Sequence, residues 1–112
     1  MIDVSPVSRQ PHHTEPAVTV VEAHQRPAGV MLLDVREPSE WSDGHAPGAV
    51  LRPLGQLDAT DLPAFATVYV ICRSGNRSAT ATRALLVAGL DAYNVAGGMN
   101  AWAEAGLPVN TG

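Results

Sequence analysis

Short apolar runs alternate along this chain with segments that have helical spacing. Four of the runs are brief and rich in aliphatic residues, which is typical of buried strands. They span residues 18–21, 30–35, 68–71 and 92–95, with a shorter candidate at 49–51. The expected helices span residues 22–25, 38–43, 78–88 and 99–105, and the punctuated stretch 54–64 favours no regular element. Strands alternating with helices predict an α/β fold in which helices cover both faces of a parallel sheet.

The segment 78–88 has the clearest helical pattern, and Gly89 follows it as a stop signal. Four of its apolar residues recur at the spacing of one helix face. They are Ala81, Ala84, Leu85 and Ala88. We expect this face to pack on the sheet. Gly97 and Gly98 precede the last expected helix and indicate a tight turn, which could border a binding site.

The length of 112 residues allows one domain with a modest core. Residues 17–112 are expected to form that domain, and residues 1–16 a flexible tail that mixes proline, histidine, serine and charge. This tail lacks the apolar centre of a signal peptide or a membrane anchor. With a single cysteine in the sequence, nothing suggests an oxidising compartment, so we expect a soluble cytoplasmic protein.

The charge of the chain is negative overall but positive in one region. The net charge of −4 argues against nucleic acid and anionic membranes as partners. Between Asp61 and Asp91 there is no acidic residue, whereas Arg73, Arg77 and Arg83 all lie in that interval. The sequence contains no lysine, which excludes a Schiff base and a Walker-type phosphate loop.

The only cysteine, Cys72, follows the apolar run 68–71 and precedes the expected helix at 78–88. A strand-to-helix turn leaves several backbone N–H groups directed into one small space, and the helix dipole adds positive charge there. A thiol in this place should ionise more readily than a free thiol, whose pKa is ~8.5. The pattern predicts a nucleophilic cysteine in an anion-binding loop. The loop residues are Arg73, Ser74, Gly75, Asn76 and Arg77.

A second polar pair follows another expected strand. Asp34 and Arg36 come at the end of the run 30–35, and the carboxyl ends of parallel strands meet at the same edge of a sheet. We expect Asp34 and Arg36 to lie beside the cysteine loop and to orient it by hydrogen bonds and an ion pair. A supporting role is favoured over a direct part in the chemistry.

Five segments together resemble a single-domain rhodanese, in the order and spacing of that family. They are LDVRE (33–37), GHAPGA (44–49), CRSGNRS (72–78), AGGM (96–99) with Trp102, and AGLPV (105–109). The resemblance covers residues 18–109. It implies a parallel five-stranded sheet between helices, and transfer of sulfane sulfur through a cysteine persulfide.

The expected reaction is a double displacement. The Cys72 thiolate would take the outer sulfur of thiosulfate or of a persulfide donor, while the backbone N–H groups and arginines of residues 73–77 hold the negative charge. Cyanide or a thiol, or a sulfur-accepting protein, would then remove the sulfur. Because the chain has no second cysteine, the acceptor must be external. We expect no metal site and no cofactor.

Two positions depart from the pattern of two-domain rhodaneses that favour thiosulfate, where an arginine and a loop lysine are typical. Glu40 and Ser74 stand at these positions, which weakens the case for thiosulfate and leaves a persulfide donor open.

One alternative function is a sulfur carrier or interaction module that docks to a partner enzyme. Another is a cysteine phosphatase or arsenate reductase, but these need five residues between cysteine and arginine, and here only residues 73–76 separate Cys72 from Arg77.

Overall fold

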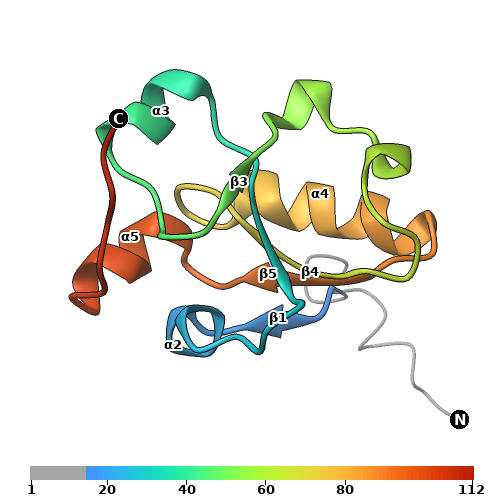
Figure 1. Cartoon of the computed structure of the whole chain (residues 1–112), viewed down its shortest axis with the longest axis horizontal. Helices are drawn as coiled ribbons and strands as arrows, with labels where there is room; N and C mark the ends of the chain where they lie inside the picture. Colours follow the sequence, from blue (N-terminus) through green and yellow to red (C-terminus); the bar gives the residue numbers. More distant parts are fainter. Residues whose placement is uncertain (1–14) are drawn as a thin grey trace, which may run out of the picture.

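Strands and helices alternate along the chain as the hydrophobic pattern predicts (Figure 1). The structure is a computed structural model and describes residues 15–112. Its strands are β1 (Ala17–Val18), β2 (Met31–Asp34), β3 (Val50–Leu51), β4 (Thr67–Ile71) and β5 (Asp91–Val95). Its helices are α2 (Val20–His24), α3 (Pro38–Asp43), α4 (Asn76–Val87) and α5 (Gly98–Glu104). Two short 3₁₀ helices, η2 (Leu54–Gln56) and η3 (Ala59–Asp61), occupy the stretch that favoured no regular element.

The five strands lie parallel in one sheet, in the order β1-β5-β4-β2-β3. Strand β4 is central: its Val70 pairs with Leu33 of β2 on one side and with Asn94 of β5 on the other. The carboxyl ends of all five strands therefore meet at one edge, where ligands bind in folds of this kind. The predicted α/β fold with a parallel five-stranded sheet is confirmed.

Helices cover both faces of the sheet, and each face has its own hydrophobic cluster. Helix α4 lies on one face, together with η2, and α2 and α5 lie together on the other (Figure 1). The first cluster packs Leu33 and Val70 of the sheet against Leu85 of α4. The second packs Leu32 against Trp102 of α5, whose side chain is fully buried. Leu32 and Leu33 are neighbours in the chain, and their side chains point to opposite faces of the sheet. A continuous apolar run can therefore contribute to both clusters.

Most predicted boundaries differ from the observed ones by one residue, and capping explains the larger differences near Thr19 and Gly75. The predicted strand 18–21 ends at Val18, because the Thr19 side chain accepts a hydrogen bond from the Glu22 N–H in a capping box that starts α2. The predicted helix 78–88 begins at Asn76, because Gly75 adopts a left-handed conformation with φ of 109° and serves as its N-cap.

The buried face of α4 also differs from the prediction. Ala84 and Ala88 are exposed. The face that packs on the sheet consists of Ser78, Ala81, Thr82 and Leu85. The hydroxyl of Thr82 is satisfied within the helix, where it donates to the Ser78 carbonyl at 2.7 Å. A buried threonine is therefore compatible with this face. A prediction that considers only apolar residues does not identify it as buried.

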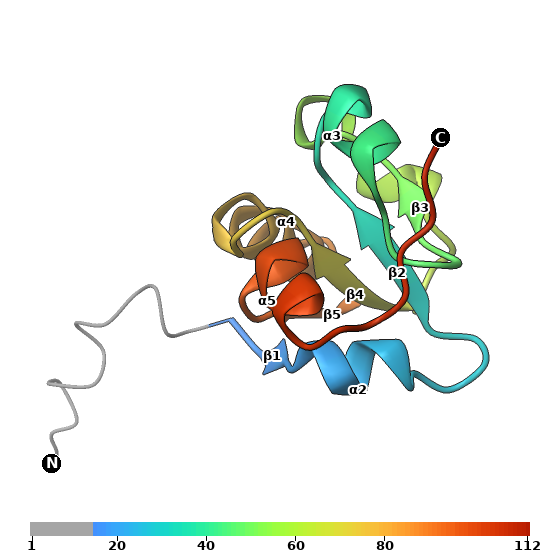
Figure 2. The same cartoon turned by 90° about the vertical axis from the view of Figure 1, so that its left-hand side faces the viewer.

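The two ends of the described chain contact the domain. Residues 1–14 of the predicted tail lie outside the described residues. Of its last two residues, Glu15 forms an ion pair with Arg83 at 3.0 Å, and the Pro16 carbonyl accepts from the Asn94 N–H at 2.8 Å. The C-terminal segment runs past β2 toward α3 (Figure 2), where the Gly112 N–H donates to Ser42. Over residues 15–112, the structure contains no helix with the length and apolar character needed to span a membrane.

Candidate functional site

Cys72 lies directly beyond the end of the central strand β4, at the N-terminus of α4. Its side chain is only 1% exposed. The sulfur atom accepts hydrogen bonds from the backbone N–H groups of Gly75 at 3.1 Å and Ser78 at 3.3 Å. Gly75 is the N-cap but has no side chain, so the cysteine sulfur takes the place of the usual side-chain acceptor for the first turn. The predicted juxtaposition of thiol, loop and helix terminus is therefore present.

These contacts also set the acidity of the thiol. Burial raises the pKa of Cys72, but hydrogen bonds from Ser78 and from the backbone N–H groups of Gly75 and Ser74 lower it, and the net shift is downward. The cause is that each donor stabilises the thiolate more than the neutral thiol. The sequence predicted this direction for the thiol pKa, whereas the nucleophilic role of Cys72 stays a prediction.

Helix α5 holds the cysteine loop from the side of β5. The N–H of Met99 donates to the Cys72 carbonyl at 2.8 Å, and the N–H of Asn100 donates to the Arg73 carbonyl at 2.9 Å. This approach requires glycine at position 98, since a Cβ there would lie 2.3 Å from the Cys72 carbonyl oxygen. The predicted tight turn at Gly97 and Gly98 thus supports the backbone of the cysteine loop directly.

A buried chain of neutral hydrogen bonds connects the sulfur to strand β5. The Ser78 hydroxyl lies 3.2 Å from the Cys72 sulfur and 2.6 Å from Oδ1 of Asn94. The Nδ2 of Asn94 donates to the Gly75 carbonyl at 3.3 Å. Sequence reasoning did not propose Ser78 or Asn94 as site residues. Ser78 ends the cysteine motif and could have been included, whereas Asn94 stands inside a strand and carries no local signal.

The two loop arginines have different surroundings. Arg77 forms two hydrogen bonds with the carboxylate of Glu40 on α3, at 2.7 and 2.9 Å. These bonds lower the pKa of Glu40 to about 2 and raise that of Arg77. Arg73 is exposed. The sequence suggested Arg77 as a positive charge for the donor, but Glu40 largely neutralises that charge.

Two clefts flank the cysteine loop. A cleft of about 250 Å³ on the α3 side is lined by Arg36, Glu40, Asp43, Arg73, Met99 and Asn100. A second cleft, of about 510 Å³, lies on the β5 side, and its lining includes Ser74, Gly75, Asn76, Arg83 and Asn94. Four of the five predicted loop residues thus line these clefts, and the fifth, Arg77, pairs with Glu40, which lines the α3-side cleft.

Asp34 and Arg36 form a buried pair beside the α3-side cleft. The guanidinium of Arg36 donates to both carboxylate oxygens of Asp34 at 2.8 to 3.1 Å, and also to the Gly44 carbonyl at 2.8 Å. The Arg36 N–H donates to the same carboxylate at 3.0 Å. The pair therefore joins the end of β2 to the end of α3, and so places the helix that carries Glu40.

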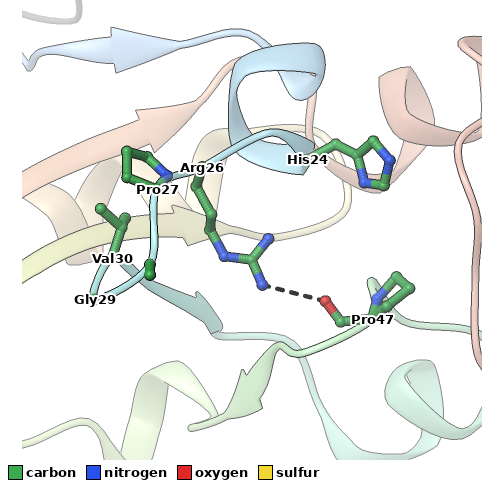
Figure 3. Close-up of a pocket in the computed structure, with 7 residues that line it drawn as sticks. His24, Arg26, Pro27, Gly29, Val30 and Pro47 are labelled. Carbon is green, nitrogen blue, oxygen red and sulfur yellow. Dashed lines mark hydrogen bonds between the residues drawn. The ribbon is translucent and has the colours of Figure 1, made fainter.

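A third hollow, of about 410 Å³, lies at the opposite edge of the sheet and includes His24 and Arg26 (Figure 3). It adjoins Val30, which precedes β2, so it is remote from the carboxyl ends of the strands. Arg26 is held there by the Ala23 carbonyl at 2.9 Å and the Pro47 carbonyl at 3.2 Å. Within the described part of the chain, no three histidine, cysteine or acidic side chains gather as a metal site would need.

Comparison with known proteins agrees with this geometry. The family model described as a rhodanese-like domain matches residues 17–105. This chain belongs to the rhodanese-like family. The match of the rhodanese-like domain includes every residue of the cysteine loop, Ser78, Asn94 and the two ion pairs Asp34–Arg36 and Glu40–Arg77.

Several relatives of this rhodanese-like domain have names that refer to sulfur. Chloroplastic thiosulfate sulfurtransferase 16 of Arabidopsis thaliana is 39% identical over 108 residues, which cover 82% of this chain and 90% of that protein. The "Putative sulfur carrier protein YrkF" of Bacillus subtilis is 40% identical over 74 residues, which cover 63% of this chain and 40% of that protein. The chain also spans 58% of the length of an uncharacterized Synechocystis relative.

Solved structures show the same fold. The crystal structure of a rhodanese-related protein from Thermoplasma volcanium matches this rhodanese-like domain with a TM-score of 0.81 at 31% identity. The match covers 87% of this chain and 99% of that protein's chain. The resemblance inferred from the sequence motifs is therefore confirmed for both family and fold.

Proposed function

We propose that this chain is a sulfurtransferase in which Cys72 carries sulfane sulfur as a persulfide. The observation that carries the proposal is the environment of the Cys72 sulfur, which itself accepts hydrogen bonds from the N–H groups of Gly75 and Ser78. A loop closed this tightly around a sulfur atom suits an anionic sulfur rather than a larger oxyanion. The names of the sulfurtransferase and sulfur-carrier relatives support the same chemistry.

The proposed reaction has two displacements. The Cys72 thiolate attacks the outer sulfur of thiosulfate, the S–S bond of the donor breaks, and its electron pair leaves with sulfite. The new S–S bond makes Cys72 a persulfide anion. Cyanide or a thiolate then attacks the terminal sulfur, forms thiocyanate or a new persulfide, and returns the electron pair to Cys72. A persulfide donor enters by the same first step, with a thiolate as leaving group.

The loop residues have distinct roles in this proposal. Backbone N–H groups of the loop hold the negative charge on sulfur, and Arg73 attracts anionic donors to the α3-side cleft. Asp34 and Arg36 hold the end of α3, and so support Arg77 of the loop indirectly, through Glu40. Because Glu40 pairs with Arg77, the mouth of the site is less positive than the two loop arginines suggest. This favours persulfide donors over the dianion thiosulfate.

A phosphatase is disfavoured by the same ion pair. A phosphate-binding loop directs its arginine to the oxyanion, whereas Arg77 forms two hydrogen bonds with Glu40.

A sulfur carrier that delivers to a partner protein is compatible with the buried thiol, and the name of the Bacillus relative favours it as a second candidate. We retain the cytoplasm as the predicted location, although one relative is chloroplastic.

The test is the mass of the intact protein after incubation with thiosulfate or with glutathione persulfide. We expect an added mass of one sulfur atom that is absent from Cys72→Ser and is removed by cyanide. No adduct with either donor would contradict the proposal. Turnover with cyanide then separates an enzyme, which cycles many times, from a carrier, which discharges rapidly only to its partner.

A further inference from the structure

The Ser78 hydroxyl lies between two competing partners, the Cys72 sulfur at 3.2 Å and Oδ1 of Asn94 at 2.6 Å. A serine hydroxyl has one hydrogen to donate. Oδ1 of an asparagine can only accept, so the shorter contact uses that hydrogen. In this arrangement the serine oxygen presents a lone pair to the sulfur, which suits a protonated thiol and disfavours a thiolate.

The orientation of the Asn94 amide is fixed by a third group. Its Nδ2 donates to the Gly75 carbonyl at 3.3 Å. If the amide were turned over, Oδ1 would face the Gly75 carbonyl oxygen, and two acceptors would oppose each other. Asn94 is only 9% exposed, and such a mismatch would be costly at a nearly buried position. Oδ1 of Asn94 therefore faces Ser78.

We propose that Asn94 is a positioning residue that competes with the Cys72 sulfur for the single hydrogen of the Ser78 hydroxyl. With Cys72 protonated, the thiol donates to Ser78 and Ser78 donates to Asn94. With Cys72 as thiolate or persulfide anion, the hydroxyl turns about its Cβ–Oγ bond to donate to sulfur, and Asn94 loses its donor. The exchange breaks no covalent bond.

This competition has a use in the reaction, and in that respect it rests on the proposed function. Backbone N–H groups already stabilise the thiolate, and a thiolate loses nucleophilicity as the pKa of its thiol falls. By competing for the hydroxyl hydrogen, Asn94 weakens this further stabilisation of the thiolate and keeps Cys72 more nucleophilic. The same hydroxyl can turn to the persulfide once sulfur has been accepted.

The charged groups around Cys72 lie outside β5, the strand that carries Asn94. They are Arg73 of the loop, Arg77 of α4, Glu40 of α3, Asp34 at the end of β2 with Arg36 just after it, and the Arg83–Glu15 pair at the β5-side cleft. Asn94 comes from β5, and its hydrogen bonds go to Ser78, Gly75 and Pro16 rather than to any of these charged groups. A change at Asn94 therefore leaves this set of charges in place, and its effect on Cys72 reports the hydrogen bond.

The experiment measures the rate of Cys72 alkylation by iodoacetamide as a function of pH, which requires no sulfur donor. Asn94→Leu is similar in size and cannot accept from Ser78. We expect the alkylation profile to move to lower pH, because one neutral hydrogen bond raises the thiolate fraction below the wild-type midpoint about fivefold. Each thiolate is then about twofold less nucleophilic, so the alkylation rate below the midpoint should rise about twofold to threefold. Asn110→Leu, which changes an exposed asparagine, should keep the wild-type profile.

The double variant Ser78→Ala/Asn94→Leu separates a hydrogen-bond effect from a general disturbance. If Asn94 acts through the hydroxyl, the double variant has the same profile as Ser78→Ala. An equal shift in both backgrounds, or no shift in Asn94→Leu, overturns the proposal. If Asn94→Leu does not fold, Asn94→Ala gives the same comparison. Failure of persulfide formation with an intact alkylation result would reject the proposed function but not this inference.

Discussion

Two arginine–carboxylate pairs lie beside the cysteine loop, and they differ mainly in their exposure to solvent. In the Asp34–Arg36 pair the side chains are 0% and 7% exposed, whereas in the Glu40–Arg77 pair they are 26% and 35% exposed. In both pairs the guanidinium forms hydrogen bonds with both oxygens of the carboxylate. The chemistry is therefore the same, and the surrounding dielectric decides what each pair contributes.

The buried pair acts as a structural connection. Removing one partner would leave a charge without compensation in the interior, and this is far more costly than the loss of the attraction itself. The exposed pair contributes little to folding because water screens it, but it changes the charge at the mouth of the site. Proximity to the cysteine thus does not distinguish a structural ion pair from one that sets the charge at the mouth of the site, whereas burial does.

The largest expected effect is that of Asp34→Ala. It leaves the Arg36 guanidinium buried without its carboxylate, and we expect a loss of about 3–5 kcal/mol in the free energy of unfolding. Urea denaturation followed by circular dichroism measures this. Glu40→Ala is the matched control, with an expected loss of about 1 kcal/mol or less. Similar losses in the two variants would show that burial does not distinguish the pairs.

Gly98→Ala tests whether α5, rather than the exposed pair, holds the cysteine loop. Its Cβ would lie 2.3 Å from the Cys72 carbonyl oxygen, so the backbone must move. We expect a loss of about 2–3 kcal/mol in the free energy of unfolding and persulfide formation at least about tenfold slower. The measurements are urea denaturation and the rate of adduct formation by mass spectrometry.

Gly106→Ala is the control for Gly98→Ala. Both glycines have positive φ, 57° and 71°, but a Cβ at Gly106 would meet no atom within 4 Å. Gly106→Ala therefore includes the cost of the left-handed conformation without the collision. If the two variants lose equal stability and activity, the contact of α5 with the loop is not what requires glycine.

A smaller effect on stability, but a clear one on specificity, is expected for Glu40→Gln. The change frees the Arg77 charge, so kcat/KM for thiosulfate should rise about threefold to tenfold at low salt. The gain should shrink at high ionic strength, because salt screens exposed charges. Glu104→Gln, at an exposed position, removes one negative charge elsewhere and serves as control. An equal gain in both variants would indicate only a general effect of net charge.

The smallest expected effect is the dependence of the exposed pair on pH. The pKa of Glu40 is lowered from 4.5 to about 2 by its hydrogen bonds with Arg77. A lowered carboxyl pKa gives stability that is fully present above the unfolded value and is lost as pH falls through the folded value. The free energy of unfolding of the wild type should therefore exceed that of Glu40→Gln above about pH 4.5, and this difference should disappear as the pH falls to about 2. The difference should stay within about 1 kcal/mol because the pair is partly exposed, and urea titrations at several pH values would measure it. A difference that is constant over this range would contradict the role of the ion pair.

Local patterns in the sequence located the strands and the cysteine. The run 68–71 and the helix that follows it predicted a strand-to-helix turn at Cys72, and the parallel sheet placed Asp34 at the same edge. The motifs also supported the correct family, which the match of the family model to residues 17–105 confirms. These features depend on neighbours in the chain, so a single sequence contains them.

The tertiary structure decided which side chains meet at the cysteine. Asn94 reaches Ser78 only because β5 pairs with β4, and Glu40 reaches Arg77 only because the Asp34–Arg36 pair joins β2 to the end of α3. Such contacts join residues that are far apart in the chain, and no local spacing records them. The sequence by itself therefore determined the fold class, the cysteine and its loop. The three-dimensional packing decided which donors reach the sulfur and how much of the loop's positive charge remains, because both depend on distance and burial.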